Sequence, residues 1–444
     1  MNKEELKTRK IAWQIIKKSY SRDQKVSDIS SEIFKQESDN LSESDKRFIT
    51  NLVQGSIRMS GRLDWEIKQV FKGDYSDLKA PVKILLRLGV YQIMYMDSIP
   101  DYAAVATTVQ LAKRIHNKLG GLANAILRTI IKESNNEIPN DKSSISDLSE
   151  YYSHPEWLFA KWIKDYSLED AISIAKWNNK TPNIWFRVNK RNYDIKLFKK
   201  YLDSENITYE TFNHIPEFVT TSNNQELLKS KLFKSGKISV QDPSAGLVVH
   251  LIDPQDTDEI ADVCAAPGGK TTYISEYINK GFINASDSDK NRLSKLKNNI
   301  IRLDIDNIEV NCLDITVSKI NKTSKILVDA PCTGTGVMSK KADIRWRRSV
   351  EQVLEMHLLQ RKILWSAAKY VKDDGILVYS TCSIEPEENY MVIDAFLKTH
   401  TDFSIECASK YIPKEYVDDR GAMVLFPPKH NIDGGFAIRL RKNG

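Results

Sequence analysis

The sequence predicts a multidomain protein: an all-helical N-terminal region, a small α/β middle domain, and a doubly wound α/β domain. Apolar residues recur at helical spacing over residues 1–133, and strands alternate with helices over residues 151–235. Repeated strand–helix units fill residues 236–444, a pattern typical of a parallel sheet covered by helices. The polar stretch 134–150 separates the first two regions, and we interpret it as a linker.

The N-terminal region is predicted to be a series of helices. Ile11, Ile15 and Ile16 share one face of a helix over residues 9–20. Ser44 is expected to cap a second helix, in which Phe48 and other apolar residues recur at helical spacing. Four more helices are expected over residues 62–71, 80–96, 102–115 and 119–133. A helical bundle by itself says little about function.

The middle region alternates between the two kinds of element. Helices are expected from residue 154 and over residues 167–176, a strand over 184–188, a helix over 193–203 and a strand over 207–212. The tryptophans at positions 157, 162, 177 and 185 could stack on nucleic-acid bases. Packing in a core is the commoner role of a tryptophan, so these residues do not decide the function.

In the C-terminal region, reactive side chains stand where predicted strands end. Strands are expected over residues 259–264, 282–287 and 308–312, a fourth ends at Asp329, and a fifth leads into Cys382 after a helix over 350–370. Ligands bind at the carboxyl ends of strands in such sheets. Cys332 follows the fourth strand, so both thiols and Asp329 can meet in one cleft. A buried structural cysteine is the commoner alternative for either thiol.

The turn after the first of these strands allows a ligand to approach the backbone closely. It consists of seven residues: Cys264, Ala265, Ala266, Pro267, Gly268, Gly269 and Lys270. Asp287, 23 residues after Cys264, stands where an acid commonly binds a ribose. A nicotinamide dinucleotide is one candidate ligand, but the turn is neither G-x-G-x-x-G nor a phosphate loop. The proline and the strand-end acids favour S-adenosyl-L-methionine.

Composition and charge narrow the class of protein further. No apolar run reaches the roughly 18 residues of a membrane span, and the charged N-terminus lacks the apolar core of a signal peptide. The five cysteines (264, 312, 332, 382 and 407) include no C-x-x-C pair, which argues against a zinc site and a disulfide framework. We expect a cytoplasmic protein without metal or membrane partner. The net charge of +6 permits a nucleic-acid partner.

Several stretches resemble known families. Residues 47–60, 85–93 and 121–128 resemble the NusB-type RNA-binding domain. Residues 241–245, 262–271, 329–336 and 381–389 resemble, in the same order, four motifs of the Sun-type (RsmB/Sun) RNA cytosine-5 methyltransferases. The resemblance implies a NusB-like all-α domain, a small RRM-like α/β domain, and a Rossmann-like class I S-adenosylmethionine-dependent methyltransferase domain. One departure is Gly435 in the stretch 433–436, where the family more often has an aromatic residue.

The resemblance also implies roles for individual residues. Cys382 is the nucleophile that adds to carbon 6 of the cytosine, Cys332 assists product release, and Asp329 contacts the base. Cofactor binding falls to the 264–270 turn, Asp287, Asp329 and Asp314, although Asp314 could instead be a helix cap. The implied substrate is a single-stranded or loop cytosine of 16S ribosomal RNA, at the position numbered 967, and we expect the enzyme to be a monomer.

A basic run directly after the Cys332 loop is the candidate RNA-binding segment: Lys340, Lys341, Arg345, Arg347 and Arg348. A cluster of positive charge beside a reactive loop suits contact with a phosphate backbone. Two other interpretations stay open. The enzyme could methylate another ribosomal or transfer RNA site, or the chain could be an RNA-binding protein without catalytic activity.

Overall fold

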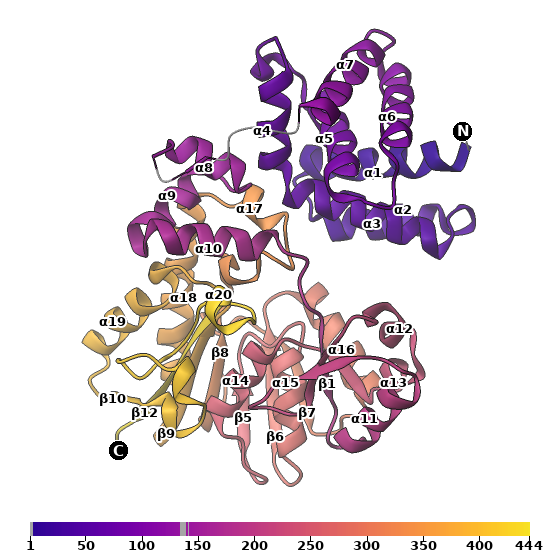
Figure 1. Ribbon diagram of the computed structural model, residues 1–444. Coiled ribbons are helices and arrows are strands. Elements are labelled where there is room, and N and C mark those ends of the chain that lie inside the picture. Colours follow the sequence, from indigo (N-terminus) through magenta and orange to yellow (C-terminus); the bar gives the residue numbers. More distant parts are fainter. Residues whose placement is uncertain (1–2, 134–138, 141) are drawn as a thin grey trace. The chain divides into compact units, whose positions relative to one another are not determined.

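The computed structural model describes residues 3–133, 139–140 and 142–444 (Figure 1). The chain forms two compact units. One contains Met1–Lys180 together with Met338–Arg348, and the other contains Thr181–Val337 and Ser349–Gly444. Within the predicted linker, residues 134–138 and 141 lie outside the described residues. The predicted domain limits at 133, 150 and 235 stay predictions.

The first unit is helical. Its long helices surround one apolar core, which includes Leu52, Leu86 and Leu127, all fully buried. The helices are α1 (Lys3–Arg22), α2 (Val26–Gln36), α3 (Glu43–Arg58), α4 (Ser60–Val70), α5 (Ala80–Tyr95), α6 (Asp101–Ile115), α7 (Leu119–Lys132), α8 (Ile145–Tyr151), α9 (Glu156–Asp165), α10 (Leu168–Asn179) and the short α17 (Ile344–Arg347).

Two details differ from the sequence prediction. Helix α2 was not expected, although Val26, Ile29 and Ile33 supply the apolar face that it buries. The cap of α3 is Ser42 rather than Ser44, because Ser42 and Asp45 form a reciprocal capping box that satisfies two backbone N–H groups. The capping box needs an acid three residues after the cap, and Asp45 stands at that distance from Ser42 only.

The second unit contains a small antiparallel sheet in the order β2-β3-β1-β4. Phe186 and Val219 face each other across β1 and β3 and are buried with Phe198 of α11. The strands are β1 (Trp185–Val188), β2 (Tyr209–Thr211), β3 (Phe218–Thr221) and β4 (Ile238–Val240), and the helices are α11 (Ile195–Ser204), α12 (Asn224–Lys229) and α13 (Lys231–Lys234).

The same unit contains an eight-stranded sheet in the order β10-β12-β9-β8-β5-β6-β7, with β11 paired to β12. The five strands from β9 to β7 are parallel, and β10, β11 and β12 are antiparallel to their neighbours. The strands are β5 (Glu259–Asp262), β6 (Phe282–Asp287), β7 (Ile308–Cys312), β8 (Thr323–Asp329), β9 (Val371–Thr381), β10 (Phe403–Glu406), β11 (Met423–Leu425) and β12 (Gly435–Lys442).

Helices cover both faces of this sheet. In β9, Ile376 and Val378 join one apolar cluster, while Leu377 and Tyr379 join another, as expected for alternating side chains. The first cluster includes α14, and the second includes α18 and α19. The helices of this domain are α14 (Pro243–Ile252), α15 (Gly269–Ile274), α16 (Lys290–Leu303), α18 (Val350–Ala368), α19 (Tyr390–Thr399) and α20 (Pro427–His430).

The order of the parallel strands fixes the position of the site. The chain runs outward from β5 to β6 and β7, and then returns to the other side of β5 with β8 and β9. The strand order therefore reverses between β5 and β8, and ligands bind at the carboxyl ends of strands at such a point. Among the described residues, the structure contains no helix long and apolar enough to cross a membrane.

Candidate active site

The two cysteines of the candidate site, Cys332 and Cys382, come from neighbouring strand ends. Strands β8 and β9 are paired so that Asp329 lies beside Ser380, and each strand then continues into a loop that contains one cysteine. The sulfur atoms of Cys332 and Cys382 lie 3.0 Å apart. The structure thus brings together the two thiols that the sequence placed 50 residues apart.

Within this pair the two sulfurs are not equivalent. The hydrogen bond to Cys382, burial, and the nearby negative charges raise the pKa of the Cys332 thiol well above its usual range. Cys332 therefore keeps its proton and can donate it to the sulfur of Cys382. A sulfur that accepts such a hydrogen bond is stabilised as a thiolate, the nucleophilic form.

An ion pair lies next to the cysteines. Lys270 Nζ lies 2.8 Å from Asp329 Oδ2, and the Ser380 hydroxyl donates to Asp329 Oδ1 at 2.9 Å. Burial lowers the pKa of Lys270, but the Asp329 carboxylate and the Cys382 sulfur outweigh it, so the pKa is raised. The ammonium group is therefore charged and favours negative charge on Cys382.

In the turn between β5 and α15 the backbone passes close to the neighbouring helix α16, whereas the approach of a ligand stays a prediction. Gly268 has a φ of +101°, and a Cβ atom there would lie 2.3 Å from Leu296 Cδ1, so only glycine fits. The backbone N–H of Ala265 donates to Ser286 at the end of β6, which joins the turn to the next strand. The peptide between Ala266 and Pro267 is cis.

The two acids predicted to bind the cofactor differ in their surroundings. Asp287 is buried, and its carboxylate accepts hydrogen bonds from the backbone N–H groups of Ala266 at 3.2 Å and Asp289 at 2.9 Å. Asp314 is exposed, and its Oδ1 accepts from both the N–H and the hydroxyl of Thr316 at 2.8 Å. Asp314 therefore caps a turn and not a helix, since no helix lies between β7 and β8 in this described part of the chain, and its role in cofactor binding stays a prediction.

Comparison with known proteins decides the family. Residues 249–441 match the 16S rRNA methyltransferase RsmB/F family, residues 6–132 match the NusB family, and residues 154–226 match a ferredoxin-like domain of RsmF/B-like methyltransferases. A probable ribosomal RNA small subunit methyltransferase B from Bacillus subtilis is 32% identical over 424 residues, which cover 92% of this chain and 93% of the relative. The chain belongs to the RsmB/F family.

Other RsmB/F relatives and solved structures agree with this placement. The ribosomal RNA small subunit methyltransferase B of Proteus mirabilis is 33% identical over 86% of this chain and 90% of its own. The crystal structure of PH0851 has a TM-score of 0.80 at 26% identity, covering 100% of this chain and 99% of that one. A methyltransferase homologue from Pyrococcus horikoshii has a TM-score of 0.59 at 27% identity, covering 68% and 99%. The predicted fold class is confirmed.

The basic run of this RsmB/F protein divides into two kinds of residue. Arg345 is fully buried, and its guanidinium donates to the carbonyl oxygens of Arg58, Ser153 and Asn178 and to the Asn179 side chain. This placement contradicts the expectation that Arg345 contacts RNA, because the side chain is fully buried and its two terminal nitrogens donate hydrogen bonds inside the helical unit. The sequence shows that position 345 carries a positive charge, but it does not show whether the side chain is buried or exposed.

The other four basic residues are at least partly accessible. Lys341 is exposed, and Lys340, Arg347 and Arg348 are half-buried. Arg347 donates to Asp23 at 3.2 Å and also lies 3.6 Å from Asp343. Their contact with RNA stays a prediction.

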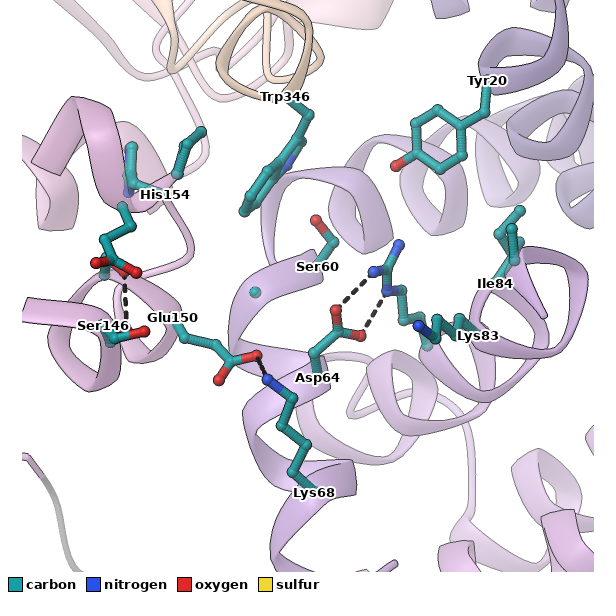
Figure 2. A pocket seen from close by; sticks show the side chains of 16 residues that line it. Tyr20, Ser60, Asp64, Lys68, Lys83, Ile84, Ser146, Glu150, His154 and Trp346 are labelled. Carbon is teal, nitrogen blue, oxygen red and sulfur yellow. Dashed lines mark hydrogen bonds and ion pairs between the residues drawn. The ribbon is translucent and has the colours of Figure 1, made fainter. Parts of the chain in front are cut away.

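The helical unit also contains a polar pocket of about 510 Å³ between α4, α5, α8 and the segment that bears Trp346 (Figure 2). Four of its charged groups form two ion pairs, and the remaining Lys83 and Glu156 carry opposite charges. Asp64 binds Arg87 at 2.6 Å, and Figure 2 shows Lys68 pointing to Glu150, 2.5 Å away. The pocket therefore offers little unbalanced charge to a phosphate.

Sequence reasoning did not assign a role to Glu388, which the structure places against both cysteine loops. The residue lies in the stretch 381–389 that resembled the family, at the end of the short 3₁₀ helix Pro386–Glu388. Nothing in the sequence says that a carboxylate here points inward. The one signal in the sequence that could have drawn attention to Glu388 is its short separation from Cys382 along the chain.

Proposed function

We propose that this protein transfers a methyl group from S-adenosyl-L-methionine to carbon 5 of a cytosine in 16S ribosomal RNA, through a covalent bond between Cys382 and carbon 6. The observation that carries the proposal is the 3.0 Å contact between Cys332 and Cys382 beside the Lys270–Asp329 ion pair. The family and the names of the relatives support small-subunit ribosomal RNA as the substrate. Position 967 is the site that the resemblance implies.

The chemistry follows from the reactivity of the base. Carbon 5 of cytosine is a poor nucleophile, but addition of the Cys382 thiolate to carbon 6 moves the electrons of the 5,6 double bond and makes carbon 5 nucleophilic. In this proposal Asp329 contacts the exocyclic amine and N3 of the base. After carbon 5 has gained the methyl group, a base in the site takes its proton, the electrons of that C–H bond re-form the 5,6 double bond, and Cys382 leaves carbon 6 as a thiolate. Cys332 assists this release.

The residues of the 264–270 turn and Asp287 fit the cofactor. Each carboxylate oxygen has about two lone pairs, so Asp287 can accept its backbone hydrogen bonds and still bind ribose hydroxyls. Gly268 keeps the turn tight, since a Cβ atom there would collide with Leu296. The small residues of the turn let a ligand approach its backbone. When bound, S-adenosyl-L-methionine supplies an electrophilic methyl group. Asp314 and Asp329 complete the proposed binding set.

The RNA must present an unstacked cytosine, because carbon 6 of a paired base is covered by its neighbours. Lys340, Lys341, Arg347 and Arg348 are the proposed contacts to the RNA backbone. We propose that the protein acts as a cytoplasmic monomer.

The experiment that tests this function separates the two cysteines. Cys382→Ala should lower methylation of a 16S fragment by at least about 10⁴-fold and form no covalent RNA adduct. Cys332→Ala should still attack and methylate, and should then accumulate a protein–RNA band that survives a denaturing gel. Cys407→Ala, an exposed cysteine remote in sequence, is the control and should keep full activity.

The outcomes distinguish the alternatives. A band in Cys382→Ala but not in Cys332→Ala would reverse the two roles. Retained activity in both variants would leave them as structural cysteines, and no methylation by the unmodified protein would favour an RNA-binding protein without catalysis. Bisulfite mapping of cellular RNA with and without the gene identifies the modified cytosine and separates the 16S site from another ribosomal or transfer RNA site.

A further inference from the structure

Glu388 is a fully buried carboxylate with four hydrogen-bond donors around it. Its Oε2 accepts from the Thr333 backbone N–H at 2.8 Å and from Gln360 Nε2 at 2.8 Å. Its Oε1 accepts from the hydroxyl of Ser383 at 2.5 Å and from the hydroxyl of Thr333. Buried carboxylates are costly unless such donors compensate for lost water, so this side chain is held tightly.

The donors place Glu388 between the two reactive loops. Thr333 directly follows Cys332, and Ser383 directly follows Cys382. One carboxylate is therefore hydrogen-bonded to the neighbour of each reactive sulfur. Gln360 of α18 extends the connection, because its amide also donates to the carbonyl of Pro331 at 2.9 Å, on the other side of Cys332.

We propose that Glu388 is the positioning residue of the cysteine pair: its carboxylate holds both loops so that the sulfurs of Cys332 and Cys382 touch. This inference rests on the proposed function, because it assigns the pair its order of reactivity. The four donors are neutral groups, so hydrogen bonding secures the carboxylate without cancelling its charge.

Two physical effects follow from this arrangement. Loss of the carboxylate frees the residues next to both sulfurs, and a displacement of about 1 Å between reacting groups can cost about 10²-fold in rate. Loss of its charge also removes one of the causes that raise the pKa of Cys332. A purely structural glutamate would affect folding and would leave the titration of Cys332 unchanged.

The test uses the full-length protein with Glu388→Gln, which keeps the shape and removes the charge. Its matched control is Glu355→Gln, an exposed carboxylate on α18. We expect Glu388→Gln to lower kcat by about 10²-fold, with the Kd for S-adenosyl-L-methionine and the KM for RNA within about twofold of the unmodified protein, and Glu355→Gln to leave all three unchanged. Glu388→Asp, which keeps the charge on a shorter side chain, should lower kcat to an intermediate degree.

A second measurement follows the protonation of the Cys332 thiol directly. In the Cys382→Ala background, the pH dependence of Cys332 alkylation by iodoacetamide is followed by mass spectrometry of its peptide. Adding Glu388→Gln should lower the midpoint by about one pH unit, and adding Glu355→Gln should not move it. Should Glu388→Gln fail to fold, the Glu388→Asp variant gives the kinetic answer and should leave the midpoint in place.

Two results would overturn the inference. One is a kcat of Glu388→Gln equal to that of the unmodified protein. The other is an unchanged alkylation midpoint together with a loss of activity that matches a loss of folded protein. Either result leaves the proposed function standing, provided that Cys332→Ala still accumulates its covalent RNA adduct. Absence of that adduct contradicts the covalent function itself.

Discussion

Arg345 and Glu388 are both fully buried charges, one in each compact unit, and each has four hydrogen-bond partners. The partners of Arg345 are carbonyl and amide oxygens of the helical unit, where no reactive side chain is proposed. Those of Glu388 include the residues next to both cysteines. A buried charge with four hydrogen-bond partners thus joins helices in one unit and positions the two cysteine loops in the other.

Arg345 and Glu388 also fix successive parts of the loop that runs from β8 to α18. The loop from β8 to α18 contains Thr333, bound to Glu388, and then the segment 338–348, which packs within the helical unit. Trp346 Nε1 donates to the carbonyl of Ile57 at 2.8 Å, next to the Arg345 partner Arg58. Deleting residues 1–133 would remove these partners, so point variants test the two regions more cleanly than truncation.

The largest effect is expected at Arg345, and it tests whether this buried charge stabilises the helical unit. Arg345→Met leaves four buried oxygens without donors and should lower the free energy of unfolding of the helical unit by about 3–5 kcal/mol. Urea denaturation followed by circular dichroism measures it, and Lys341→Met, at an exposed position of the same segment, should change it by less than about 0.5 kcal/mol. A loss below about 1 kcal/mol at Arg345 would contradict the structural role.

Asp262 extends the comparison to a buried carboxylate that has fewer hydrogen-bond donors than Glu388. Within the described part of the chain, Thr271 donates to its Oδ2 at 2.7 Å and its Oδ1 has no hydrogen-bond partner. Burial raises the pKa of Asp262 to about 7. The folded protein therefore keeps this proton above the pH at which the unfolded chain has lost it, and stability falls as the pH rises toward 7.

This difference predicts the pH dependence. Between pH 5 and pH 7.5 the Asp262 contribution to the free energy of unfolding should fall by about 2–3 kcal/mol. Asp262→Asn should remove that slope, whereas Asp402→Asn, at an exposed position, should retain it. Denaturant unfolding at both pH values measures the effect. Parallel pH curves for Asp262→Asn and the unmodified protein would refute the assignment.

Asp287 is the intermediate case, a buried carboxylate with two backbone donors and lone pairs left for a ligand. Asp287→Ala should weaken binding of S-adenosyl-L-methionine by about 1.5–3 kcal/mol, the cost of losing a charged hydrogen bond. Titration calorimetry measures it, with Asp306→Ala at an exposed site as control. Unchanged affinity in a folded Asp287→Ala variant would remove the ribose role.

The smallest effect is expected at Lys341, an exposed charge in the segment that contains Arg345. If it contacts one phosphate, Lys341→Ala should reduce the slope of log K for RNA binding against log salt by about 0.7. Binding is measured between 50 and 200 mM salt, roughly the range in which such contacts are resolved. Lys372→Ala, exposed at the other end of β9 from Cys382, is the control. An unchanged slope would exclude Lys341 from the contact surface.

The sequence by itself determined the class of each region and the order of many of its elements, although helix α2 and helix α8 within the predicted linker were not expected. Strands β6 and β7 begin and end at the predicted residues, because their apolar runs and the turns around them are local signals. The strand-end positions of Asp329 and Cys382 follow from the same signals. The motifs at 264–270 and 381–389 carried the family, since their residue types and spacing are written in the chain.

Only the tertiary structure decided which distant groups touch. The contact between Cys332 and Cys382 depends on the pairing of β8 with β9, and the position of Glu388 between their loops depends on how the chain returns to the sheet after Thr381. Arg345 and Lys341 look alike in a basic run, yet one is buried and the other exposed. Burial and long-range hydrogen bonding are set by the packing of elements far apart in sequence, and local patterns do not contain that information.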